Sequence, residues 1–193
     1  EALSGQGTGG QEAVESVFGV ILGTGVGGGL VIQNKLLSGR HRIAGEWGHN
    51  PLPATQLVHL SDAEKKRPCY CGKYDCIETY VSGPGLALSF ALKYQQDKDS
   101  KDILKLVRQQ NEAALHVWNN YLDQLAASLA QVVNILDPQI IVLGGGMSLI
   151  AEIYQTLAQR MAPYVFTHDF STPILPAKLG DSAGVYGAAW LST

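Results

Sequence analysis

The sequence predicts an α/β fold of the ribonuclease H kind, and three observations indicate it. Three short apolar stretches near the N-terminus are separated by glycines and a polar turn, which is typical of an antiparallel meander. A long segment follows with hydrophobic residues at three- and four-residue spacing, as in a helix. Beyond that helix, apolar strand patterns alternate with helical ones, which favours a sheet with a parallel part.

The first of these stretches, residues 16 to 22, has the pattern of a buried strand. After a run of glycines, Leu30 to Ile32 predicts a second short strand. The polar turn of residues 33 to 35 then leads to Leu36 and Leu37, which complete the meander.

Residues 45 to 78 show no sustained periodicity and contain prolines at 51, 53 and 68. We expect this region to be rich in loops. From Gly85 the character becomes helical, with apolar residues at Leu86, Phe90 and Leu92 and then at Ile103, Leu104 and Val107.

The long helix is predicted over residues 112 to 136. Its buried stripe consists of Leu115, Trp118, Leu122, Leu125, Leu129, Val132, Val133 and Leu136. This stripe is core rather than a cofactor site. Asp137 and Pro138 end the helix.

The remaining elements alternate. A continuous apolar strand, residues 139 to 143, suits the centre of a parallel sheet, and three glycines turn it into a helix of about residues 149 to 161. A strand near residues 174 to 177 and a final helix of about 183 to 191 follow, with Asp181 or Ser182 as its cap.

Length and composition allow one large domain or one lobe of a larger protein. The chain has 193 residues, of which 46% are hydrophobic, and a formal net charge of −3. The mixed charges indicate neither a nucleic-acid-binding nor a membrane-attracted surface. No segment predicts a membrane span or a secretory signal, so we expect a cytoplasmic protein. Because the chain starts at Glu1, we also expect an N-terminal part to precede it.

All three cysteines fall within eight residues, at Cys69, Cys71 and Cys76. Three thiolates on a tight loop supply one face of a tetrahedral zinc site, which needs four ligands. A disulfide framework is a poorer explanation, because it needs an oxidising compartment and usually an even number of cysteines. The cluster therefore predicts a zinc site.

A histidine is the expected fourth ligand. His49 is favoured because it lies in a dense polar and glycine-rich segment, residues 45 to 51, twenty positions before Cys69. His59 is the alternative. Surface or packing roles are expected for the others, which are His41, His116 and His168.

Glycines crowd the segment after the first strand, which reads Gly23, Thr24, Gly25, Val26, Gly27, Gly28, Gly29. The spacing matches GxGxxG, but a dinucleotide-binding loop must open a helix and here strand residues follow. Consecutive backbone N–H groups and the Thr24 hydroxyl can instead bind phosphate. A plain hairpin turn is the alternative, although five glycines in seven residues exceed what a turn requires.

A second glycine run, Gly144, Gly145 and Gly146 followed by Met147, ends the strand of residues 139 to 143. The carboxyl ends of parallel strands are where ligands bind in open α/β sheets. Flat backbone there accommodates a purine ring or a ribose, and a tight strand-to-helix connection is the alternative. Together the two runs predict a nucleotide site.

In combination, the motifs resemble the C-terminal lobe of ROK-family sugar kinases along nearly the whole chain. They are GTGVGGG, GEWGH, CYCGKYDCIE, NILDPQIIVLGGGM and GDSAGVYGAAWL. GEWGHNPLP and CIETYVSG look most like bacterial fructokinases with mannokinase-like breadth. The resemblance implies an actin and hexokinase-like fold, transfer of the ATP γ-phosphoryl group to a sugar hydroxyl with Mg²⁺, and a structural Zn²⁺ that stabilises a loop insertion.

Carried onto this chain, the resemblance implies a role for each motif. Residues 23 to 29 become the second phosphate loop, and residues 144 to 147 the adenosine side of the nucleotide site. The implied zinc ligands are His49, Cys69, Cys71 and Cys76.

The same resemblance makes Glu46 and Glu78 acceptors for sugar hydroxyls, and His49 an additional sugar contact. A solvated or capping carboxylate is the alternative for both glutamates. Residues 45 to 78 are thus a zinc and sugar subregion within a C-terminal lobe that spans residues 1 to 193. In this hypothesis the metal preorganises the sugar pocket.

One position departs from the family pattern, because Asp75 stands where a glycine usually precedes the last cysteine. Aspartate is among the few residues that tolerate a positive φ, so we expect the site to be intact.

The family's catalytic aspartate and first phosphate loop are expected upstream of Glu1. Asp137 and Asp181 do not replace that aspartate, because helix termination and capping explain them. No catalytic residue is therefore assigned to this chain, and we expect the 193 residues alone to be inactive.

Three functions remain open. The first is an ATP-dependent hexose kinase, working as a homodimer, with fructose selected by family likeness alone. The second is the sugar-sensing domain of a ROK-family transcriptional repressor, and the third is a bare zinc-binding interaction domain. The intact GTGVGGG segment favours the kinase, because a pure sensor need not keep a phosphate turn.

Overall fold

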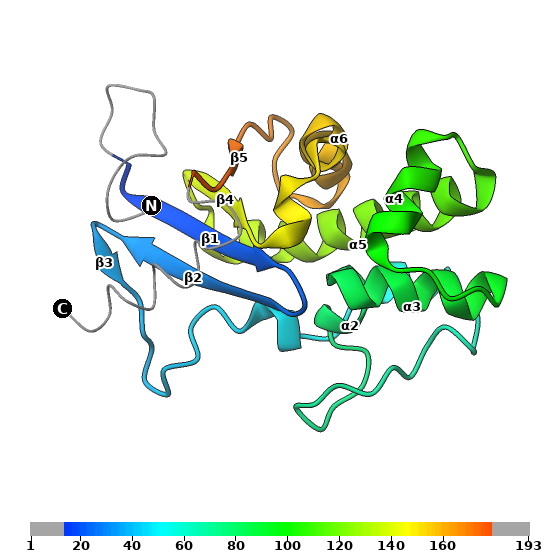
Figure 1. The fold of residues 1–193 in the computed structure, drawn as a ribbon. Coiled ribbons are helices and arrows are strands. Elements are labelled where there is room, and N and C mark those ends of the chain that lie inside the picture. The colour runs from blue at the N-terminus through cyan, green and yellow to red at the C-terminus, as the bar shows by residue number, and fades with distance from the viewer. Residues whose placement is uncertain (1–13, 179–193) are drawn as a thin grey trace.

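The computed structural model describes residues 14–178, which form a five-stranded sheet with helices packed against it (Figure 1). The strands lie in the order β3-β2-β1-β4-β5. Antiparallel pairing joins β1 to β2 and β2 to β3, whereas β1, β4 and β5 run parallel. Their bounds are β1 Ser16–Leu22, β2 Val26–Ile32, β3 Lys35–Leu36, β4 Ile140–Gly144 and β5 Ile174–Pro176. This order confirms the predicted ribonuclease H-like sheet.

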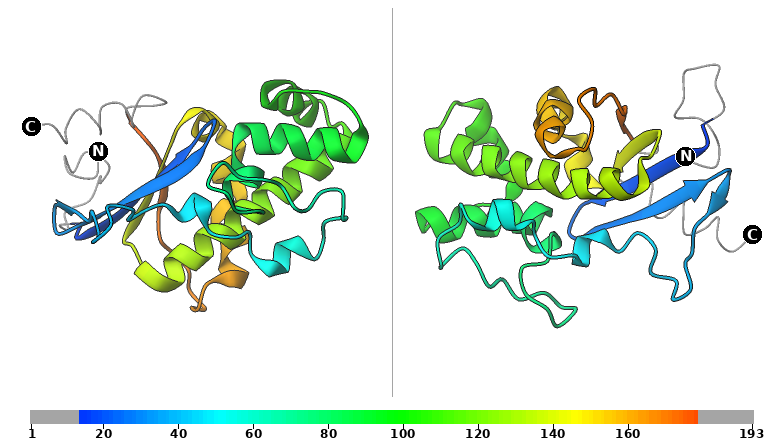
Figure 2. Two further views of the ribbon diagram at one scale, coloured as in Figure 1. Left: turned by 90° about the horizontal axis from the view of Figure 1, so that it is seen from below. Right: turned by 180° about the vertical axis from the view of Figure 1, so that it is seen from behind.

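The helices lie mainly to one side of the sheet when the molecule is seen from below (Figure 2). The longest, α5, packs against α3, α4 and α6. The α-helices are α1 Ala54–Leu57, α2 Glu78–Val81, α3 Gly83–Tyr94, α4 Ser100–Arg108, α5 Glu112–Leu136 and α6 Ala151–Met161. Short 3-10 turns are η1 Trp47–His49, η2 Gly146–Leu149 and η3 Ala162–Tyr164.

The core lies between α5 and the sheet. Side chains alternate along β1, so Phe18, Val20 and Leu22 point into the main hydrophobic cluster. From α5, Leu125 and Leu129 join the same cluster and are fully buried.

The observed bounds of α5, Glu112–Leu136, agree with the predicted ones, and a cap at each end explains them. The Asn111 side chain accepts a hydrogen bond from Ala114 N at 3.0 Å, and Asp137 closes the helix with φ 41° and ψ 57°. The buried stripe holds for the other six residues, whereas Leu115 is only partly buried and Leu136 is 37% exposed. Leu136 lies in the last turn, where the helix passes the edge of the core.

The second strand begins earlier than predicted. β2 starts at Val26 rather than Leu30, and Leu22 pairs with Val26 across the hairpin. The predicted glycine loop is therefore divided, with residues 23 to 25 in the turn and residues 26 to 29 in the strand. Glycines carry no side chain that could display strand alternation, and backbone pairing with β1 defines this half of β2.

The later elements follow the predicted order. The α6 helix begins at Ala151, two residues later than predicted, because η2 occupies Gly146–Leu149. The strand predicted at residues 139 to 143 is β4, Ile140–Gly144, and β5 confirms the strand near residue 174. The predicted last helix, with its Asp181 or Ser182 cap, lies outside the described residues.

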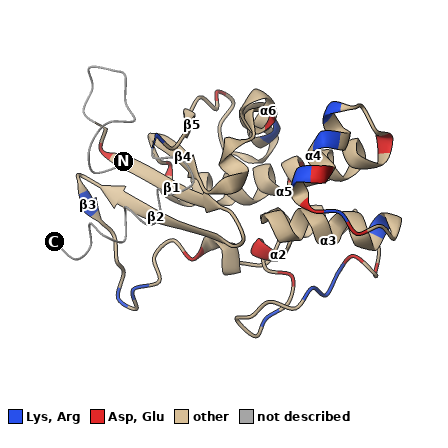
Figure 3. Ribbon diagram, in the orientation of Figure 1, with Lys and Arg blue, Asp and Glu red and all other residues tan. Residues whose placement is uncertain are grey.

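Basic and acidic positions are interspersed along the ribbon, and α4 carries both (Figure 3). Among the helices of residues 14–178, none has the length and apolar character that a bilayer crossing requires.

Candidate functional site

The histidine and cysteines predicted to bind zinc meet at one point. One ligand atom from each of His49, Cys69, Cys71 and Cys76 lies within 4.8 Å of all the others. The Cys71 and Cys76 sulfurs are 3.6 Å apart, and His49 Nδ1 is 3.4 Å from the Cys69 sulfur. Two sulfurs bound to one tetrahedral zinc lie about 3.8 Å apart, so the four side chains fit that ion. The alternative ligand, His59, is not part of this group.

Backbone pairing explains how the four residues come together. Leu52 N donates to Asp75 O at 2.8 Å and Ile77 N donates to Asn50 O at 2.9 Å, which sets the segment after His49 beside Cys76. The cysteine loop itself closes through a hydrogen bond from Cys69 N to Lys73 O at 2.9 Å. The predicted metal ligands are thus positioned by hydrogen bonds within the predicted loop region.

The thiols of Cys71 and Cys76 differ in acidity. Burial, followed by the neighbouring Cys71 and Cys69, raises the pKa of the Cys76 thiol to about 12. A hydrogen bond from the Lys73 backbone is the main reason that the pKa of Cys71 is lowered. Thiols this close cannot all ionise together without a compensating cation, and a divalent metal supplies that charge when bound.

His49 faces two different environments through its two ring nitrogens. Nδ1 lies toward the Cys69 sulfur, whereas Nε2 is 2.8 Å from the Tyr70 hydroxyl and 3.8 Å from Glu46 Oε2. Glu46 precedes η1 and its side chain is 56% exposed, so it can accept hydrogen bonds from a ligand. The arrangement allows a metal on one side of the imidazole and a polar ligand on the other.

The segment that carries Glu46 and His49 lies directly on β2. A Cβ at Gly45, which has a φ of 95°, would be 2.2 Å from Gly28 O, and a Cβ at Gly48 would be 2.1 Å from Val26 O. The indole Nε1 of Trp47 donates to Gly27 O at 2.9 Å. Only glycine at 45 and 48 permits this approach, because any side chain would meet backbone.

Glu78, at the start of α2, is attached to the tip of the β1–β2 hairpin. Its Oε2 accepts a hydrogen bond from Val26 N at 2.8 Å, and a Cβ on Gly25 would be 2.7 Å from that oxygen. Gly83 N donates to Gly23 O at 2.9 Å, so the start of α3 binds the same turn. Figure 1 shows the hairpin tip beside α2 and α3.

The two glycine runs lie at the same edge of the sheet. Ile21 of β1 pairs with Gly144 of β4, and the parallel strands therefore end side by side. A Cβ on Gly145, which has a φ of 83°, would be 2.5 Å from Leu22 O, whereas a Cβ on Gly23 or Gly146 would meet no protein atom within 4 Å. Open backbone on adjacent turns is what a nucleotide phosphate needs.

Arg67, Asp75 and Tyr80, in and beside the cysteine loop, make contacts that the sequence did not predict. Arg67, which is 3% exposed, donates from its guanidinium to the carbonyls of Glu64, Thr79 and Gly85. Its guanidinium carbon also lies 4.0 Å from the centre of the Tyr80 ring.

Asp75 has the expected positive φ, 55°, and its Oδ1 accepts from both the Tyr80 hydroxyl and Arg67 N. These contacts join residues five and eight positions apart in an irregular loop region, where no periodic pattern indicates them.

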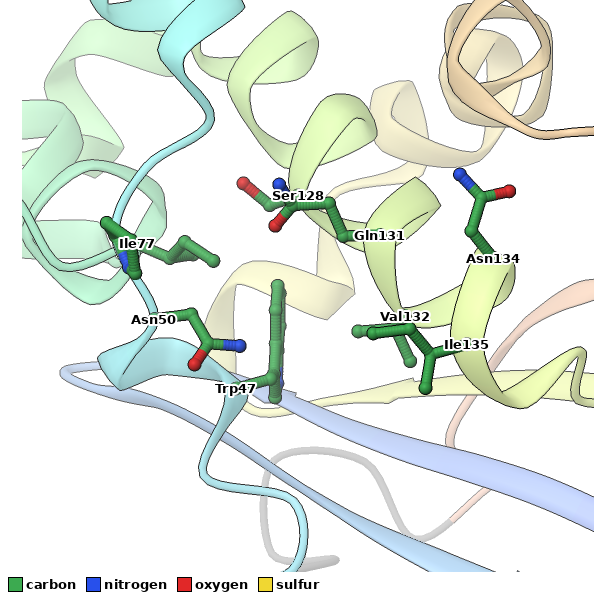
Figure 4. A pocket seen from close by; sticks show the side chains of 9 residues that line it. Trp47, Asn50, Ile77, Ser128, Gln131, Val132, Asn134 and Ile135 are labelled. Atoms are coloured by element: carbon green, nitrogen blue, oxygen red, sulfur yellow. The ribbon is translucent and has the colours of Figure 1, made fainter.

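A cavity of about 440 Å³ lies beside Trp47, between η1 and α5 (Figure 4). Figure 4 shows the amide groups of Asn50, Gln131 and Asn134 around it, with Ile77, Val132 and Ile135 as apolar lining. None of the predicted ligand-binding residues lines this cavity, and no sequence motif indicates it.

Comparisons with known proteins give the family and the fold of the chain. The chain is 39% identical over 177 residues to an N-acetyl-D-glucosamine kinase of Vibrio vulnificus. The matched region covers 92% of this chain and 58% of that protein. The chain thus spans about three fifths of the length of the curated relatives it matches.

Solved structures of similar shape include a ROK hexokinase from Thermus thermophilus, with a TM-score of 0.80 and 26% identity, over 98% of this chain and 61% of the other. A ROK family glucokinase from Streptomyces griseus, in complex with glucose and AMPPNP, has a TM-score of 0.78 and 26% identity, over 98% of this chain and 65% of the other. These neighbours confirm the hexokinase-like fold. Because the ROK family model also matches all residues from 1 to 193, the chain belongs to the ROK family.

Proposed function

We propose that the full-length protein transfers the γ-phosphoryl group of ATP to a hexose or an N-acetylhexosamine, and that this chain is its C-terminal lobe. The observation that carries the proposal is the convergence of two predicted ligand regions. The sugar-binding candidates Glu46, His49 and Glu78 are fastened to the β1–β2 hairpin, whose turn adjoins the second glycine run.

N-acetylglucosamine is the first candidate substrate, because the similar kinase of Vibrio vulnificus carries that name. Fructose, the substrate that motif likeness favours, ranks below N-acetylglucosamine. The printed names of the two solved structures, a hexokinase and a glucokinase, support the wider class of hexose substrates.

Each part of the site has a physical role in this proposal. Glu46 and the free oxygen of Glu78 accept hydrogen bonds from sugar hydroxyls, and His49 adds a further contact. Backbone N–H groups of the hairpin turn and the Thr24 hydroxyl donate to phosphate, while Mg²⁺ accompanies the ATP. A bound Zn²⁺ would hold His49 and the three cysteines, and so would fix the orientation of the imidazole.

The catalytic aspartate is assigned to the part of the protein before Glu1. Residues 1 to 193 alone are therefore inactive in this proposal, and the full-length enzyme is a cytoplasmic homodimer. A sugar-sensing repressor is disfavoured because the hairpin turn keeps open backbone at Gly23, which a sensor without nucleotide would not need.

Steady-state assays with the purified full-length protein test the proposal. We expect ATP-dependent phosphorylation with the highest kcat/KM for N-acetylglucosamine in a panel that also contains glucose, mannose and fructose. The Glu46→Gln variant provides the matched site control and should raise KM for the sugar. Absence of turnover with every sugar, in protein that retains its zinc, would reject the kinase. Turnover by residues 1 to 193 above buffer background would reject the assignment of the aspartate.

A further inference from the structure

Tyr70 stands between two of the predicted metal ligands, Cys69 and Cys71, yet its side chain points outward and is 83% exposed. Its hydroxyl lies 2.8 Å from His49 Nε2, and the two rings meet edge to face with centroids 4.9 Å apart at 87°. At this exposure burial does not hold the ring in place, and its recorded contacts are the hydrogen bond and the edge-to-face contact with His49.

The chemistry of His49 determines what this contact is. Because Nδ1 faces the cysteine sulfurs, a bound metal would take that nitrogen, and the remaining proton would then be on Nε2. In that state Nε2–H would donate to the Tyr70 oxygen.

The Tyr70 hydroxyl has carboxylates nearby. Glu78 and Glu46 are the carboxylates whose charges act on this phenol. A phenol hydroxyl can donate as well as accept a hydrogen bond. Its oxygen has the same hydrogen-bonding capacity as a sugar hydroxyl, and it lies among the same three side chains that are proposed to bind the sugar.

Two oxygens cannot both accept this N–H with good geometry. A sugar hydroxyl can reach His49 Nε2 only if the phenol moves away. That movement costs little, because Tyr70 is exposed and the structure records this hydrogen bond as its one side-chain partner among the described residues.

We propose that Tyr70 is a specificity-determining residue whose hydroxyl occupies the place of a substrate hydroxyl at His49 and is displaced when the sugar binds. The inference rests on the proposed function, since it takes the site of Glu46, His49 and Glu78 to bind sugar. A sugar that presents no oxygen to His49 leaves the phenol in place and meets a blocked site. Tyr70 thereby selects for a substrate that can replace its own hydrogen bond.

The test is the Tyr70→Phe variant of the full-length protein, which keeps the ring and removes only the competing oxygen. Isothermal titration with N-acetylglucosamine and with glucose, without ATP, should give a Kd about three- to tenfold lower than that of the wild type. In the kinase assay KM should fall by a similar factor with kcat unchanged. The matched control is Tyr74→Phe, since Tyr74 is 64% exposed in the same loop and has no recorded hydroxyl partner within residues 14–178. It should leave both constants unchanged.

The outcomes are distinguishable. An unchanged or higher Kd in the Tyr70→Phe variant overturns the inference while the sugar site stands, because the wild type still binds. Loss of zinc from that variant, measured by metal analysis, also overturns it, since Tyr70 would then support the metal cluster instead. If the zinc-loaded wild type binds none of the sugars, the proposed function fails and the inference fails with it.

Discussion

Glu78 Oε2 accepts a hydrogen bond from the backbone N–H of Val26 at 2.8 Å, across 52 positions of the sequence. One of these residues is proposed to bind sugar, and the other follows the turn proposed to bind phosphate. A single carboxylate therefore contributes to both ligand regions, which Glu46 does not. This asymmetry between two glutamates makes the proposed site testable.

The first prediction compares Glu78→Gln with Glu46→Gln in the full-length protein. Each change should raise KM for the sugar by about tenfold or more, because a charge-assisted hydrogen bond is lost. Only Glu78→Gln should also raise KM for ATP, by about threefold, since a neutral amide holds Val26 N less strongly. Steady-state kinetics with each substrate varied in turn measure both effects. Equal effects of the two variants on ATP would show that the hydrogen bond does not couple the regions.

The second prediction concerns two glycines of the hairpin turn. Gly25→Ala should weaken sugar and ATP binding together, because its Cβ would be 2.7 Å from Glu78 Oε2. Gly23→Ala meets no protein atom within 4 Å, so its effect on protein packing should be negligible. If phosphate approaches this turn, Gly23→Ala should raise KM for ATP alone, with an unchanged melting temperature. An ATP affinity equal to the wild type would place the phosphates elsewhere.

Local sequence patterns predicted the long elements well. The bounds of β1 and α5 follow from a continuous apolar run and from 3.6-residue periodicity, and both were confirmed. The first half of β2 was missed because its glycines carry no side chains to show a pattern. Their function in the fold is to let the segment of Gly45 and Gly48 touch backbone, and this contact is not visible in either segment alone.

The third prediction is that Cys76→Ser lowers zinc affinity on the order of a hundredfold or more, because one of four ligands is lost. Sugar affinity should fall with it, since His49 loses the metal that orients its ring. Metal analysis and calorimetry on the same full-length sample measure the two effects. Zinc loss with unchanged sugar affinity would contradict the link between metal and pocket.

The fourth prediction concerns Asp75. Asp75→Ala should destabilise the protein by about 2–4 kcal/mol, because the buried Tyr80 hydroxyl loses its close acceptor and alanine is strained at a φ of 55°. Asp75→Asn should cost less than about 1 kcal/mol, since asparagine tolerates this φ and still accepts hydrogen bonds. Denaturant unfolding with saturating zinc compares the two. Equal losses would assign the effect to charge instead of to geometry.

Motif likeness predicted the set of candidate site residues, whereas their partners needed the structure. Cys69, Cys71 and Cys76 are informative because cysteine is rare and clustered here. The contact of Tyr70 with His49 depends on how two loop segments meet, and that of Asp75 with Tyr80 on how the cysteine loop turns back onto α2. Such contacts have no periodicity, and a single sequence therefore gives no signal for them.

The position of Trp47 has a practical consequence. Its indole is 4% exposed, meets the Phe18 ring edge-on with centroids 6.3 Å apart, and donates to Gly27 O in the strand that leaves the hairpin. Glu46 and Gly48 are its immediate neighbours. The fold thus places a natural fluorophore where the two proposed ligand regions join. Replacing Trp118 and Trp190 by phenylalanine would make Trp47 the one tryptophan within residues 1 to 193. The intrinsic fluorescence of Trp47 would then report, without any label, when either ligand changes the environment of its indole.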